Sequence, residues 1–135
     1  MENRRTHLTL IQGVINRMAG NLFFLRGWTI TLIAALLALF IKDNEVAYII
    51  YFLLVLVLVF WLMDAYFLSQ ERLYRALYNK VRKMNENEID FSMDVSEFKQ
   101  LKQNTVIYAM CSRTLLVFYT PLVGIVLTAI YLTNN

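Results

Sequence analysis

Three ionisable residues, Arg26, Asp64 and Arg113, stand next to long uncharged stretches of the sequence. Asp64 directly follows an apolar run, and a carboxylate in that position is costly unless it is paired or hydrated. The chemistry open to these residues is ion pairing between helices, so we expect a cluster of Arg26, Asp64 and Arg113 that ties three helices together. The alternative is that the three side chains extend separately to water.

The sequence contains no pattern of residues that indicates a catalytic site or a metal site. His7 is the only histidine, and no nearby serine or aspartate is placed to form a triad with it. Cys111, the only cysteine, is expected to be a small buried hydrophobic side chain. The sequence contains no glycine-rich phosphate loop and no set of His and Cys at metal-ligand spacing. We therefore expect no enzyme, no cofactor and no metal site.

The composition is typical of a membrane protein. Of 135 residues, 59% are hydrophobic and 17% are charged, and a domain of this size cannot bury so much apolar surface. Residues 46–63 and 114–133 carry no charge, and each run is close to the length that crosses a hydrocarbon core of roughly 30 Å. Residues 22–41 reach that length only with Arg26 inside the helix. The prediction is one all-α integral membrane domain, 1–135, with three transmembrane helices.

The distribution of basic residues predicts the orientation of these helices. All but one of the 13 Lys and Arg residues precede residue 27 or lie between residues 64 and 113, and the exception is Lys42. Because cytoplasmic loops carry the excess of positive charge, we expect the N-terminus and the segment 64–113 in the cytoplasm and the C-terminus outside.

Residues 1–21 precede the first predicted span and have the pattern of an amphipathic helix. Apolar residues recur there at helical spacing and continue into the span: Leu8, Ile11, Ile15, Met18, Leu22 and Leu25. One interpretation is an interfacial helix that lies on the inner leaflet. The other is a gate that packs against neighbouring subunits.

The segment 64–113 is predicted to be a small cytoplasmic insertion, part helical and part extended. Residues 89–96 alternate apolar and polar side chains, which is the pattern of a strand. A lone strand needs another edge to pair with, so a neighbouring subunit or another protein would supply it. The alternative is an extended segment that packs its apolar face across the cytoplasmic helices.

Four residues of this insertion are candidate contacts for a cytoplasmic protein or a small anionic ligand: Arg72, Arg75, Phe91 and Met93. General binding of nucleic acid is not favoured, because acidic residues in the segment 85–98 would neutralise the basic helix before it. Membrane lipid also accounts for basic residues close to a span.

Small residues mark faces on the first and third spans at which helices could approach closely. These residues are Gly27, Thr31, Ala35 and Ala38 in the first span and Thr120, Gly124 and Thr128 in the third. The second span is bulky almost throughout, so we expect it to face lipid. Three thin helices expose most of their surface in a monomer, and the small-residue faces therefore predict a homo-oligomer.

Three stretches carry a resemblance to known proteins: Arg17-Met-Ala-Gly-Asn-Leu-Phe-Phe-Leu-Arg-Gly-Trp28, Gln70-Glu-Arg-Leu-Tyr-Arg-Ala-Leu-Tyr78 and Asp90-Phe-Ser-Met93. In these the chain resembles a family of small uncharacterised bacterial inner-membrane proteins. The resemblance implies a bacterial inner-membrane location and assigns no activity. In architecture alone, the chain is also similar to small multi-span effectors of bacterial antiphage systems.

Two functions fit these expectations. The first is a homo-oligomeric membrane effector that responds to a cytoplasmic signal or partner by forming a pore, with a role in antiviral defence as the architectural similarity implies. The alternative is a non-conducting anchor or scaffold that recruits a soluble partner through residues 85–98.

Overall fold

The computed structural model describes residues 2–42 and 48–134. Within these ranges the chain is helical and contains no strand. The elements, in order, are α1 (Glu2–Lys42), α2 (Tyr48–Arg82), three short 3-10 turns (Glu86–Glu88, Ser96–Phe98 and Lys102–Asn104), α3 (Val106–Met110) and α4 (Arg113–Asn134).

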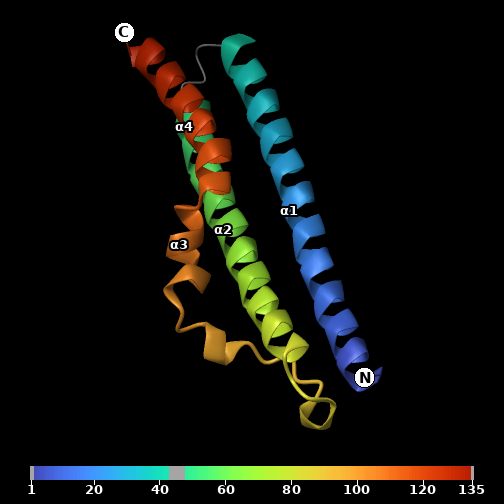
Figure 1. Cartoon of the computed structure of the whole chain (residues 1–135). Coiled ribbons are helices and arrows are strands. Elements are labelled where there is room, and N and C mark those ends of the chain that lie inside the picture. Colours follow the sequence, from blue (N-terminus) through green and yellow to red (C-terminus); the bar gives the residue numbers. More distant parts are fainter. Residues whose placement is uncertain (1, 43–47, 135) are drawn as a thin grey trace.

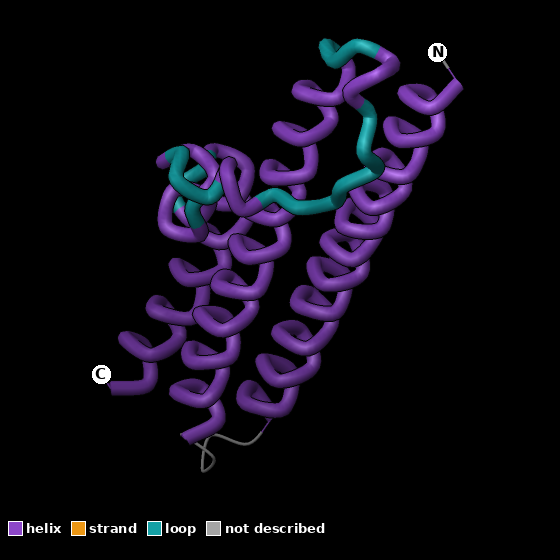
Figure 2. The backbone as a smooth tube through the Cα atoms, turned by 90° about the horizontal axis from the view of Figure 1, so that it is seen from below, coloured by secondary structure: helices purple, strands orange, loops and turns teal. Residues whose placement is uncertain are grey.

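The three long helices lie side by side with α2 in the middle (Figures 1 and 2). The helix α1 runs antiparallel to α2 along one side of it, and α4 lies against the half of α2 nearest its N-terminus. The short helix α3 packs beside the middle of α2 and leads into α4 (Figure 1). The N-terminus and the segment after α2 lie at one end of the molecule, and the C-terminus lies at the other.

The helices α1, α2 and α4 are all long and apolar enough to cross a membrane, which confirms the prediction of an all-helical chain with three such helices. At 1.5 Å per residue, α4 is about 33 Å long and matches a hydrocarbon core of roughly 30 Å. By the same measure α1 is about 60 Å long and α2 about 50 Å. These two helices therefore extend together well beyond the length of α4.

The second span was expected to face lipid, but α2 is the central helix and only one side of it, which includes Phe52, Val55 and Val59, is exposed. Its residues Ile50, Leu53 and Val57 are fully buried. They pack in one hydrophobic cluster with residues of α1, α3 and α4: Ile33, Phe40, Ala109, Leu115, Tyr119 and Val126. Bulky aliphatic side chains fill the space on both sides of a central helix, whereas the small residues of α1 and α4 are left on the outside.

Residues 1–21 do not form a helix separate from the first span, since α1 runs without interruption from Glu2 to Lys42. The apolar stripe expected on its N-terminal half is covered by the C-terminal half of α2. Ile11 and Ile15 are at most 2% exposed and pack against Leu73, Leu77 and Val81. The stripe has a protein partner, so it does not face outward as an interfacial helix would require.

The segment after α2 crosses the ends of α1 and α2 as an extended chain (Figure 2). Ile89, Met93 and Val95 pack on the same cluster as Ile11. Phe91 interrupts the extended backbone, because its φ of 57° lies in the left-handed region, which a regular strand does not contain. Of the two interpretations of residues 89–96, the structure shows the extended segment that packs on the helices, and no strand forms there.

Candidate functional site

A buried ion pair joins α1 to α2 between the two hydrophobic clusters. Arg26 donates two hydrogen bonds to Asp64, from Nε to Oδ2 at 2.9 Å and from Nη2 to Oδ1 at 3.1 Å. The side chain of Asp64 is fully buried, whereas that of Arg26 is 28% exposed. Paired donors that match both carboxylate oxygens make this one of the stronger kinds of ion pair.

Tyr119 brings α4 into the same cluster. Its hydroxyl lies 3.0 Å from Asp64 Oδ2 and 3.3 Å from the carbonyl oxygen of Phe60. The hydroxyl has a single proton to donate, and the closer, charged carboxylate is the better acceptor. One carboxylate thus accepts hydrogen bonds from two different helices, and the polar cluster of Arg26, Asp64 and Tyr119 ties the three long helices together.

Aromatic rings surround this polar cluster. Trp61 stacks on Tyr119 with ring centroids 5.7 Å apart and planes inclined by 2°. The Trp61 indole also donates a hydrogen bond to the carbonyl oxygen of Met110, at 3.2 Å. On the other side, the Arg26 guanidinium lies 5.9 Å from the centre of the Phe118 ring. These contacts pack aromatic rings against the ion pair and attach the end of α3 to α2.

Arg113 does not belong to the cluster, although the sequence predicted it there. It is exposed, and it forms no ion pair within residues 2–42 and 48–134. Six residues separate Arg113 from Tyr119, so the two side chains leave α4 about 120° apart. Because Tyr119 faces α2, Arg113 must face outward.

The small-residue faces are not used in packing within the chain. All seven residues are exposed: Gly27, Thr31, Ala35, Ala38, Thr120, Gly124 and Thr128. A side-chain carbon added at Gly27 or Gly124 would meet nothing within 4 Å. These faces of α1 and α4 point away from α2 and remain open to lipid or to another helix.

The four candidate contact residues do not come together in one site. Arg75 is paired with Glu71 on its own helix at 2.7 Å, and Arg72 lies over the Tyr108 ring of α3 at 5.7 Å. Phe91 and Met93 are in the segment that crosses α1 and α2, and the ring of Phe91 lies 5.6 Å from that of His7. Arg72 and Arg75 therefore do not share a binding site with Phe91 and Met93.

The sequence-based predictions did not include one residue of the polar cluster, Tyr119, and were wrong about the burial of another residue, Cys111. Tyr119 was not considered, although a hydroxyl inside an apolar span is a signal that it needs a partner there. Cys111 was expected to be buried and is exposed, because it follows the short helix α3 where the chain turns into α4.

No protein-family model, curated protein or solved structure matched this chain in the comparisons.

Proposed function

We propose that the protein is a homo-oligomeric effector of the bacterial inner membrane that permeabilises the membrane when a cytoplasmic signal or partner acts on residues 64–113. The observation that carries the proposal is the outward position of the small-residue faces on α1 and α4. Faces of this kind let helices approach closely in lipid, and a single chain makes no use of them.

Hydrogen bonding on these faces supports helix association. The Thr31 hydroxyl donates to the carbonyl oxygen of Gly27 at 2.9 Å, and that of Thr128 donates to Gly124 at 2.8 Å. Both hydroxyls are thus satisfied by their own helix, so the faces can lie against lipid in a monomer and against a helix in an oligomer. Such a surface suits a protein that changes its state of assembly.

An apolar groove between α1 and α4 provides a second surface for another copy of the chain. Its volume is about 630 Å³, and its lining residues are Leu37, Phe40, Ile125, Thr128, Ala129, Leu132 and Thr133. The groove continues the small-residue face through Thr128. A helix from a second copy that packs on Gly124 would therefore also contact this groove.

The unbroken helices supply a path from the cytoplasmic segment to the spans. The segment 85–98 packs on the N-terminal half of α1 and the C-terminal half of α2. Both helices run without interruption from that contact to the polar cluster at Asp64 and beyond. Displacement of the cytoplasmic end would shift two packed helices in the membrane, which is how rigid elements transmit a change.

The alternative, a non-conducting anchor that recruits a partner through residues 85–98, has less support. Four apolar side chains of residues 89–96 could contact a partner. Three of them, Ile89, Met93 and Val95, already pack on α1 and α2. Only Phe91 presents a large apolar surface, at 41% exposure.

The proposal predicts that Gly124→Leu weakens assembly and permeabilisation together. A leucine side chain on the small-residue face would separate two close helices, at a cost of about 1–3 kcal/mol per contact. We expect a shift to smaller species in detergent and a rate of dye release from liposomes that is about 5- to 150-fold lower, since 1.4 kcal/mol corresponds to a factor of ten. Ala35→Leu should act in the same way through α1.

Val55→Leu is the matched control, because Val55 is 57% exposed on α2 and lies outside both small-residue faces. Its assembly and dye release should equal those of the unmodified protein. Induced expression in a bacterial host, with membrane potential followed by a voltage-sensitive dye, tests the same variants in cells. Unchanged assembly in both Gly124→Leu and Ala35→Leu would contradict self-association. An assembled protein that causes no leak even when it is expressed together with the products of neighbouring genes would favour the anchor.

The proposed orientation makes a separate prediction. An alkaline-phosphatase reporter, which is active only outside the cytoplasm, should be active when fused after Asn135 and inactive when fused after Met84. The reason is the concentration of basic residues before residue 27 and between residues 64 and 113. The opposite pattern of activity would reverse the proposed topology and remove the cytoplasmic signal from the mechanism.

A further inference from the structure

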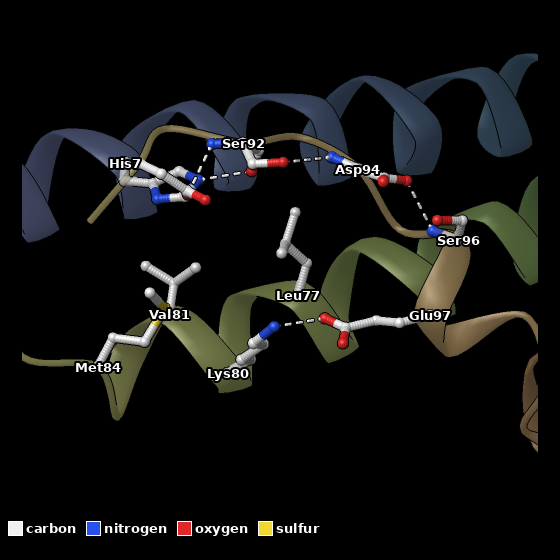
Figure 3. Close-up of a pocket in the computed structure, with 10 residues that line it drawn as sticks. His7, Leu77, Lys80, Val81, Met84, Ser92, Asp94, Ser96 and Glu97 are labelled. Carbon is white, nitrogen blue, oxygen red and sulfur yellow. Dashed lines mark hydrogen bonds and ion pairs between the residues drawn. The ribbon is translucent and has the colours of Figure 1, made fainter. Parts of the chain in front are cut away.

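A cavity of about 270 Å³ lies between α1, α2 and the segment 90–97 (Figure 3). His7 of α1 forms one wall, and Leu77, Val81 and Met84 lie on the opposite side at the end of α2. The remaining lining residues are polar: Lys80, Asp90, Ser92, Asp94, Ser96 and Glu97. None of them belongs to the polar cluster around Asp64 or to the small-residue faces.

His7 is held rigidly at the cavity with one ring nitrogen unused. The residue is 1% exposed, and Nε2 lies 2.8 Å from the carbonyl oxygen of Ser92. A carbonyl oxygen only accepts hydrogen bonds, so Nε2 is the donor, and Nδ1 can accept a hydrogen bond when the ring is neutral. Nδ1 is buried and has no hydrogen-bond partner in the described part of the chain. A buried polar atom without a partner is uncommon and requires an explanation.

The charges around the cavity favour a cation. Three carboxylates line it, from Asp90, Asp94 and Glu97, against one ammonium group, that of Lys80. Lys80 is already paired with Glu97 at 2.6 Å. Hydrogen bonds from the Ser96 backbone and side chain lower the pKa of Asp94, so this carboxylate is charged at neutral pH. An anion would therefore meet net repulsion here.

The cation that fits is organic. Within the described residues, no group of three or more His, Cys, Asp or Glu side chains is arranged to hold a metal ion. The apolar wall of Leu77, Val81 and Met84 would instead contact methylene groups. A cavity of this size is slightly smaller than those that take drug-sized ligands, which fill about 300–1,000 Å³.

We propose that this cavity binds a small aliphatic amine in its ammonium form, with a short methylene chain. An N–H of the ammonium group donates to His7 Nδ1, and its positive charge is balanced by Asp90 and Asp94. The methylene chain lies against Val81 and Met84. The bound amine bridges α1, the end of α2 and the segment 90–97, and it strengthens the contact between these three elements.

The site goes beyond the proposed permeabilising activity and does not depend on it. Binding is measured on the purified full chain in detergent, where no membrane potential or leak is involved. A failure to permeabilise liposomes would leave the binding result unaffected, and a failure to bind an amine would leave the oligomerisation argument unaffected.

The single histidine of the chain makes the binding test direct, because its ring signals need no assignment. Protein labelled with ¹⁵N-histidine is titrated with 1,4-diaminobutane and followed by NMR. A separate titration with inorganic phosphate tests whether the cavity binds an anion instead. We expect a saturable shift of the Nδ1 resonance with the diamine and no saturable shift with phosphate. Absence of saturation with the diamine, or saturation with phosphate instead, would overturn the proposal.

Two variants test the assigned contacts by calorimetry. His7→Gln keeps a donor for the Ser92 carbonyl, but its acceptor, Oε1, does not lie where Nδ1 lies, and we expect it to weaken diamine binding by about tenfold. Asp94→Asn keeps the hydrogen bond from the Ser96 N–H, which lies 2.9 Å from Asp94 Oδ1, and removes one charge. Asp94→Asn should weaken diamine binding by a similar factor. This variant tests the proposed site even if His7→Gln does not fold.

Glu88→Gln is the matched control, because Glu88 is an exposed acid of the same segment that does not line the cavity. Glutamine also serves at this position of a capping box, so the local turn is preserved. Its affinity should stay within about twofold of the unmodified protein. An equal loss of affinity in Glu88→Gln and Asp94→Asn would mean that the diamine is attracted only by general surface charge, and would refute the site.

Discussion

Replacement of Asp64 by alanine is expected to lower the free energy of unfolding in detergent by about 3 kcal/mol. Asp64 is fully buried, and its carboxylate accepts hydrogen bonds from Arg26 and Tyr119. The variant leaves the Arg26 guanidinium without its counter-charge among aromatic rings. Breaking a buried pair costs about 3–5 kcal/mol, and the 28% exposure of Arg26 places this pair at the low end.

A double-mutant cycle separates pairing from general damage. Asp64→Arg alone should be worse than Asp64→Ala, because it places two like charges together. Asp64→Arg combined with Arg26→Asp should recover part of the loss, with a coupling of about 1–3 kcal/mol in thermal unfolding. Arg113→Ala is the control and should change stability by no more than about 0.5 kcal/mol, since Arg113 is exposed. Additive single effects would show that Arg26 and Asp64 do not act as a pair.

Ile11→Ala is expected to destabilise the half of the molecule that contains the N-terminus by about 3 kcal/mol. Ile11 is fully buried among Leu73, Leu77 and Val81, so the shorter side chain leaves a cavity between α1 and α2. Hydrogen exchange of the N-terminal half of α1 reports this loss locally. We expect faster exchange there and little change near the C-terminus of α4, which belongs to the other hydrophobic cluster.

The neighbouring residue provides a matched control for this prediction. Leu10 is 50% exposed, so Leu10→Ala should cost no more than about 0.5 kcal/mol by the same measurement. A helix that lay on the membrane surface would use its apolar stripe against lipid, and Ile11→Ala would then leave the exchange of α2 unchanged. That outcome would contradict the docking of α1 on α2.

The contact tested at Ile11 and the cavity at His7 lie on the same part of the fold. His7 is one helical turn before Ile11, and the segment that contacts His7 also packs on the cluster around Ile11. An amine bound at His7 would therefore support this cluster, and Ile11→Ala would weaken its site. Both measurements concern the end of the molecule that the proposed function assigns to signal reception.

Local composition is sufficient to predict three long, apolar helices in this chain. Runs such as 46–63 and 114–133 are uncharged over lengths that few other structures could accommodate, so local composition is sufficient evidence. It also indicated that Asp64 needs a partner, because a carboxylate at the end of such a run is costly alone. Both conclusions follow from the solvation of single segments and require no knowledge of their neighbours.

The neighbour that each helix face meets could not be predicted from local composition and is known from the packing of the helices. Arg26 and Arg113 were equivalent partners for Asp64 in the sequence, and the rotation of α4 places Tyr119 toward α2 and Arg113 outward. Likewise, the stripe through Ile11 suited a lipid surface as well as another helix, and the antiparallel course of α2 covers it. Periodicity shows which side of a helix is apolar, but lipid and protein both satisfy an apolar side. The choice between them depends on long-range packing, which couples residues far apart in the chain.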